Sequence, residues 1–135
     1  TGDTFFGGNV REKVTISATA STGTINFDAI TQAVLYFTTN ASGNFTINVR
    51  GDGSTTLNSI MATGDALTIA FLSTQGSSAY YMSAFTVDGS SVTPKYQGGS
   101  AFSAGNASGI DSYAITVIKT GDAAFTALAA QTQFG

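Results

Sequence analysis

The sequence predicts an all-β fold, an antiparallel β-sandwich of about nine short strands, of which a jelly roll is one specific form. Three observations lead to this prediction. Apolar residues recur at every second position in several segments, which is the pattern of a strand with one buried face. Clusters of Gly, Asp, Asn and Ser separate these segments at the spacing of sandwich turns. A helical pattern occurs only over residues 55–61 and accounts for one or two turns.

The chain of 135 residues fits a single domain. We expect residues 1–12 to form an N-terminal arm and residues 13–135 to form one β-sandwich domain. Four segments alternate cleanly between apolar and polar residues, and the apolar side of each should face the core. Their apolar residues are Val14, Ile16 and Ala18; Ile25 and Phe27; Phe45, Ile47 and Val49; and Leu67, Ile69 and Phe71.

Three further segments, residues 33–37, 79–87 and 112–118, carry large apolar residues on both faces. In one interpretation they are central strands whose outer face is covered by loops. In the other, the second face is a contact between subunits, because a monomer seldom exposes a large contiguous apolar patch. The residues that we single out as a candidate interaction surface in these segments are Tyr80, Tyr81, Met82 and Tyr113.

The turns between the strands are marked by short polar clusters. Asp88 and Gly89 predict a hairpin between residues 85–87 and Val92, because Gly accepts the positive φ that such turns need. The longest break in the strand pattern is the Gly-rich loop over residues 97–109, whose one large apolar side chain is Phe102. Phe102 is the fifth candidate interaction residue; the competing interpretation is that its ring folds back to cap its own sandwich.

Composition argues against most catalytic chemistry. The chain has no Cys and no His, so it lacks thiolate chemistry, the usual general base and the commonest transition-metal ligands. Glu12 is the single Glu, and the remaining carboxylates are Asp residues, most of them in turns, without the spacing of a calcium loop. We therefore expect no enzyme activity, no catalytic residue, no cofactor and no metal site.

Charge and hydropathy argue against two classes of partner, nucleic acids and membranes. Only 10% of residues are charged, and the formal net charge is -3 at pH 7. Polarity comes instead from 36 Ser and Thr residues. The chain offers no basic patch for a phosphate backbone, so we expect no nucleic-acid binding. The sequence contains no apolar run of the roughly 20 residues needed to cross a bilayer, so we expect no membrane partner.

Several longer motifs resemble a β-module of virion structural and fibre-like proteins from marine tailed bacteriophages, notably those of cyanobacteria. They are AYYMSAFTVDG (79–89), VTPKYQGG (92–99), AGNASGIDSY (104–113), IKT (118–120), NVRGDG (48–53) and TLN (56–58). The resemblance spans roughly residues 10–134. Tyr96 and Phe102 occupy positions where it leads us to expect Trp and Pro.

The resemblance implies a non-enzymatic virion structural protein, either a capsid decoration or a capsid-associated fibre, on the outer surface of the particle. The alternative that it leaves open is a tail-fibre or adhesin module that binds a host-surface glycan. Its implied partners are copies of itself, with a trimer favoured by analogy, and other virion proteins such as the major capsid protein. It implies no catalytic residues.

Overall fold

A computed structural model describes residues 2–135 and shows a two-layered β-sandwich, which confirms the predicted all-β class. Sheet A contains, in order, β1 (Val14–Ala20), β3 (Val34–Thr39), β5 (Ala66–Thr74), β9 (Ile110–Gly121), β10 (Ala124–Phe134) and β8 (Lys95–Tyr96). Sheet B contains, in order, β2 (Gly23–Asp28), β4 (Phe45–Arg50), β6 (Met82–Val87) and β7 (Ser90–Ser91). The ten strands are close to the predicted number.

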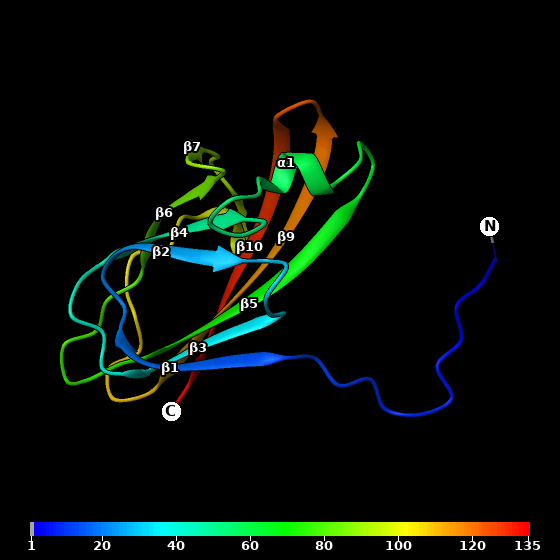
Figure 1. Ribbon diagram of the computed structural model, residues 1–135. Helices are drawn as coiled ribbons and strands as arrows, with labels where there is room; N and C mark the ends of the chain where they lie inside the picture. The colour runs from blue at the N-terminus through cyan, green and yellow to red at the C-terminus, as the bar shows by residue number, and fades with distance from the viewer. Residues whose placement is uncertain (1) are drawn as a thin grey trace.

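The first six strands alternate between the two sheets, so that the chain winds as a flattened coil (Figure 1). Strands two apart in the sequence therefore run in the same direction, and β1 pairs with β3, β3 with β5, β2 with β4 and β4 with β6, all in parallel. The crossover that parallel pairing requires is the intervening strand of the opposite sheet. The expectation of a purely antiparallel sandwich, and of a jelly roll in particular, is wrong for this half of the molecule.

Antiparallel pairing begins where the coil ends. β5 pairs with β9, and β9 and β10 form a long hairpin that makes up much of sheet A. β6 and β7 form the predicted hairpin around Asp88 and Gly89, whose φ angles are 51° and 81°. Positive φ at both central residues is the geometry of a type I′ turn, which matches the twist of the flanking strands. The hairpin prediction is confirmed.

The core lies between the two sheets and contains one continuous apolar cluster with nine aromatic rings in or against it. Phe37 meets Phe71, Phe71 meets Phe45, and Phe45 meets Tyr113, with ring centroids 5.2–5.6 Å apart. These edge-to-face arrangements place the positive ring edge against the negative ring face. The aromatic line joins both sheets, since Phe45 belongs to β4 and the other three rings to sheet A.

The alternation predicted the buried face correctly in β2, β4 and β5, where Phe27, Ile47 and Phe71 are fully buried. It was wrong in β1, an edge strand of sheet A. Val14 and Ile16 are 43% and 67% exposed and lie on the outer face. The inner side of β1 carries polar residues instead, and Thr15 donates a hydrogen bond to the Gln32 side chain at 2.8 Å.

The predicted short helix is present as α1 (Leu57–Ile60), with Thr56 as its N-cap. A 3-10 turn, η1 (Gln97–Gly99), opens the Gly-rich loop. Residues 2–13 precede β1 without helix or strand, and in Figure 1 they extend away from the sandwich. Within residues 2–135, no helix has the length and apolar character to span a membrane.

Candidate functional site

Two of the five predicted interaction residues are in the core. Met82 and Tyr113 are almost completely buried between the sheets, so neither belongs to a surface of the folded chain. The Tyr113 hydroxyl accepts a hydrogen bond from the Met82 backbone N–H at 3.2 Å and another from the Gln131 amide at 2.9 Å. Burial raises the pKa of Tyr113 well above its usual value. Residues 112–118 carry apolar side chains on both faces of β9, as predicted, but Tyr113 lies on the face that points into the core.

Tyr80, Tyr81 and Phe102 are half-exposed. Gln75 holds the Tyr80 backbone from both sides, because its amide nitrogen donates to the Tyr80 carbonyl and its oxygen accepts from the Tyr80 N–H. The Phe102 ring packs against Tyr96 and Tyr113, with centroid distances of 4.9 and 5.4 Å. Phe102 therefore caps its own sandwich, as the second interpretation predicted.

The loop over residues 97–109 is held against its own domain by a buried carboxylate. Oδ2 of Asp111 accepts hydrogen bonds from the Asn106 N–H at 2.9 Å and the Gln75 amide at 3.1 Å. Oδ1 of Asp111 is buried without a hydrogen-bond partner among the described residues. Desolvation raises the pKa of this carboxyl group. A Cβ at Gly105 would collide with the Tyr80 carbonyl oxygen, so the small residues of the loop allow close approach to its own domain.

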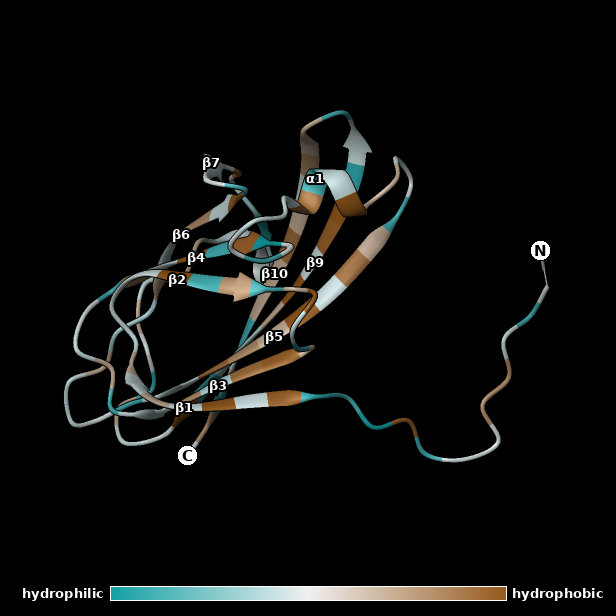
Figure 2. Ribbon diagram, viewed as in Figure 1, coloured by the Kyte–Doolittle hydropathy of each residue, from teal (hydrophilic) through white to brown (hydrophobic). Residues whose placement is uncertain are grey.

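The largest feature that sequence reasoning placed only in part is the outer face of sheet A. Side chains that are paired across β1, β3, β5, β9 and β10 line this face in two rows. One row is Val14, Val34, Ala70, Ala114 and Ala130, and the next is Ile16, Tyr36, Leu72, Ser112 and Thr132. Figure 2 shows brown, apolar stretches along these strands, to which residues of both faces contribute.

Charge is almost absent from this face. Within the described chain, the strands of sheet A carry three charged residues, and two of them, Asp111 and Lys119, are buried on the inner side. The third is Lys95 in β8, which is paired with the exposed Leu128 of β10. The molecule has two layers, so sheet B and the core cover only the inner side of sheet A. The segment over residues 33–37 gave the sequence signal for this face, because Val34 and Tyr36 are apolar on the side opposite to Leu35.

A shallow groove of about 430 Å³ lies at the β8 end of the same face. We call it the sheet A groove. Its lining includes Ala114 and Thr116 of β9, Leu128 and Ala130 of β10, and Lys95 of β8. Leu128 is paired directly with Lys95, and the next outward pair along β9 and β10 is Ala114 and Ala130, whose short side chains leave a hollow beside the two longer ones.

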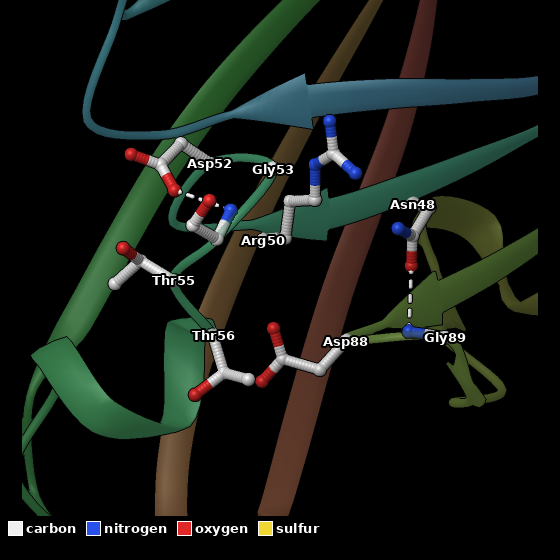
Figure 3. Close-up of a pocket in the computed structure, with 9 residues that line it drawn as sticks. Asn48, Arg50, Asp52, Gly53, Thr55, Thr56, Asp88 and Gly89 are labelled. Carbon is white, nitrogen blue, oxygen red and sulfur yellow. Dashed lines mark hydrogen bonds between the residues drawn. The ribbon is translucent and has the colours of Figure 1, made fainter.

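The opposite outer face, on sheet B, is polar. Here the Asn48 side chain donates to Asn26 at 2.9 Å and accepts from the Thr86 hydroxyl at 2.6 Å. It also accepts from the Gly89 N–H at 2.9 Å, as the dashed line in Figure 3 shows. Beside this network is an open cleft of about 410 Å³, which we call the sheet B cleft. It is lined by Asn48, Arg50, Asp52, Gly53, Ser54, Thr55, Thr56, Asp88 and Gly89.

Each charged group of the sheet B cleft already has a partner in the chain. Nε of Arg50 donates to Asp28 at 2.6 Å, and this hydrogen bond raises the pKa of Arg50. Asp52 accepts from the Ser54 N–H at 2.8 Å, which lowers the pKa of Asp52. Asp88 accepts from the first backbone N–H groups of α1, those of Leu57 and Asn58. The sequence Arg50-Gly51-Asp52 is thus a strand end followed by a turn.

This arrangement does not provide an acid–base pair. A general acid or base needs an oxygen or nitrogen atom that is free to exchange a proton with the substrate. These carboxylates instead accept backbone hydrogen bonds in a turn and at the start of α1. The single Glu, Glu12, lies in the arm, outside both the cleft and the groove. Among residues 2–135, no group of three or more acidic, His or Cys residues lies close enough together to hold a metal ion.

Comparison of the chain with protein-family models, curated proteins and solved structures finds no match. The surfaces of the molecule therefore carry the functional argument. They differ sharply, with an apolar, nearly uncharged outer face on sheet A and a hydrogen-bonded polar face with a cleft on sheet B.

Proposed function

We propose that the chain is a non-enzymatic structural protein on the outside of a bacteriophage particle, a capsid decoration or capsid-associated fibre module that assembles with copies of itself. The observation that carries the proposal is the outer face of sheet A. Large apolar patches of this kind on a soluble chain mark protein contact sites. Val14, Ile16, Tyr36 and Leu72 lie together on it, and their strands β1, β3 and β5 contain no charged residue.

The two faces suit a protein that is attached on one side and exposed on the other. Apolar area with few charges is the composition of an interface core, while a polar hydrogen-bonded surface is stable in water. The Asn48 network and the Arg50–Asp28 pair give sheet B such a surface. Sheet A would then face a neighbouring copy or the capsid, and sheet B would face solvent.

Copy number in purified particles tests the proposal. Quantitative mass spectrometry that finds hundreds of copies in each particle is the expected result for a decoration protein. A handful of copies would favour a tail fibre, and absence from the particles would contradict the proposal. Light scattering on the isolated chain gives a second readout. We expect a trimer to be the main assembled species, and a 13.7 kDa monomer alone would argue against self-assembly.

A second candidate function, binding of a host-surface glycan, is favoured by the sheet B cleft. Its amide, hydroxyl and guanidinium groups are the donors and acceptors that sugar hydroxyls require, and the cleft is open to solvent. Gly53 lines the cleft, and a Cβ there would meet nothing closer than the Arg50 side chain at 3.8 Å. Gly53→Leu should therefore fill the cleft without disturbing the fold.

Binding to a glycan array separates the two functions. A glycan-binding module should lose its signal in Gly53→Leu and keep it in the control Ala62→Leu, which changes an exposed residue outside the cleft. A chain that binds no glycan on the array leaves the structural function as the better account. Cleavage of polysaccharide that is lost in Glu12→Gln would contradict both candidates, because neither includes catalysis.

A further inference from the structure

The N-terminal arm carries an apolar segment that its own domain does not use. Residues 2–13 form no helix or strand, and every residue in this range is exposed. Phe5 and Phe6 are 89% and 66% exposed. Two adjacent Phe side chains left in water forgo a large apolar burial, which a binding partner would supply.

The arm leaves the domain along the line of β1. The carbonyl oxygen of Lys13 accepts hydrogen bonds from the N–H groups of Ala33 and Val34, at 3.1 and 3.2 Å. These bonds hold the chain beside β3 up to the end of the sheet. Beyond this point the arm continues outward, as Figure 1 shows. It bends at Gly7 and Gly8.

This geometry directs the Phe pair away from its own sheet. The six Cα–Cα steps from Gly8 to Val14 span up to about 20 Å in extended form, whereas the three steps from Gly8 back to Phe5 span only about 10 Å. A turn at the glycines therefore does not bring Phe5 or Phe6 back to the outer face of the same molecule. A second copy is free to present its own face to them.

The sheet A groove has the matching chemistry. Its Ala114, Leu128 and Ala130 side chains offer apolar contact, and its small residues leave room for an aromatic ring. Lys95 is at its edge and is the one charged residue on that face among the described residues. Asp3 is the one charged residue between positions 2 and 10 and lies two residues before Phe5. The two charges are opposite in sign, which favours this pairing and orients the arm.

We propose that residues 3–6 of one copy dock in the sheet A groove of a second copy, with Phe5 and Phe6 on Ala114 and Ala130 and with Asp3 beside Lys95. This inference rests on the self-assembly proposed above and names the contact that would produce it. The contact joins two different surfaces, so each copy both gives an arm and receives one. Such a contact closes into a ring when the rotation between copies permits, and a trimer is the smallest ring beyond a dimer.

Cysteine cross-linking on the full chain tests the contact, because the natural chain has no Cys. Chains with Asp3→Cys are mixed with chains carrying Lys95→Cys, and a short bismaleimide is added. A covalent dimer that contains one chain of each kind is the expected product. The control mixture pairs Asp3→Cys with Thr24→Cys, an exposed position on sheet B, and should give no comparable product. Equal yields in both mixtures, or none in either, would overturn the proposal.

A double variant separates this contact from assembly in general. Phe5→Ser with Phe6→Ser should lower the assembled fraction in sedimentation velocity at least tenfold, while Ile30→Ser, which removes another exposed apolar side chain, should not. If the double variant assembles normally, the arm is not the contact and the inference fails, although the proposed function stands. If the natural chain is monomeric at every concentration, the arm contact also fails, and particle copy number decides the proposed function separately.

Discussion

The ring of Phe102 packs edge to face against the ring of Tyr113, with centroids 5.4 Å apart, and so ties the Gly-rich loop to the centre of the core. Phe102→Ala should lower the free energy of unfolding by about 2–3 kcal/mol, less than for a fully buried Phe, because the ring is half-exposed. Urea denaturation followed by far-UV circular dichroism measures the change.

The matched control is Phe134→Ala, which removes a more exposed ring at the end of β10. Its effect should stay within about 1 kcal/mol, since little apolar area is lost from the core. A Phe102→Ala chain with an unchanged midpoint and impaired assembly would show that the ring serves a partner instead of its own fold.

Asp111 should make the protein less stable as the pH rises. Its folded-state pKa is raised by desolvation, so the folded chain holds the proton more tightly than the unfolded chain. Below the ordinary value of 3.8 both states are protonated and the group has no effect. Above it, the ionised carboxylate is stable in the unfolded chain and costly in the folded one, and stability falls until the pH passes the raised pKa.

Asp111→Asn removes this titration and keeps a carbonyl oxygen for the Asn106 N–H. The unfolding free energy of Asp111→Asn minus that of the natural chain should therefore increase between about pH 4 and pH 7. Urea titrations at a series of pH values provide the comparison. A difference that does not change with pH would mean that Asp111 titrates normally.

The sandwich and much of its core were predictable because burial leaves a period-two pattern wherever one face of a strand is apolar. Ile47 and Phe71 followed directly from this pattern. The pattern does not indicate whether the apolar face of a strand points toward the core or toward solvent. It therefore predicts a buried Ile16, whereas the Ile16 side chain is exposed on the outer face. Turn residues mark where a strand ends, but they do not say whether the next strand joins the same sheet. The coil of alternating strands therefore gave no sequence signal.

The surfaces were less predictable for a related reason. A run such as residues 112–118 is apolar on both faces, and only the pairing of β9 with β5 and β10 decides that Tyr113 is inside and Ala114 outside. The polar groups that line the sheet B cleft come from β4, the loop after it and the turn between β6 and β7. Their proximity depends on the parallel pairing of β4 with β6, which the sequence did not show.

Lys119 should be a stabilising residue although it is a buried cation. Its ammonium group donates to the carbonyl oxygens of Asn58 and Met61 at 2.7 and 2.8 Å, which fixes α1 and the chain after it. Lys119→Met leaves both carbonyls without this donor and should lower the free energy of unfolding by about 2–3 kcal/mol, as measured by urea denaturation.

Lys95→Met, at an exposed position, is the control and should change the free energy of unfolding by less than about 0.5 kcal/mol. Equal effects of the two substitutions would mean that the Lys119 hydrogen bonds contribute nothing measurable.

Gly105 should tolerate no side chain, because the backbone of the Gly-rich loop lies directly against the chain before β6. A Cβ there would overlap the Tyr80 carbonyl oxygen and come within 3.1 Å of the Gln75 amide, which itself holds Tyr80 in place. Both neighbours are fixed, so Gly105→Ala must displace the loop and weaken the Asp111 hydrogen bond to Asn106. The free energy of unfolding should fall by about 2 kcal/mol or more. Gly53→Ala is the matched control, because a Cβ there would meet only the Arg50 side chain, at an ordinary contact distance of 3.8 Å. The reduced freedom of the unfolded chain should leave stability unchanged or raised by up to about 1 kcal/mol. If Gly105→Ala is as stable as Gly53→Ala, the loop is not packed against Tyr80 in solution, and its small residues are free to approach a partner instead.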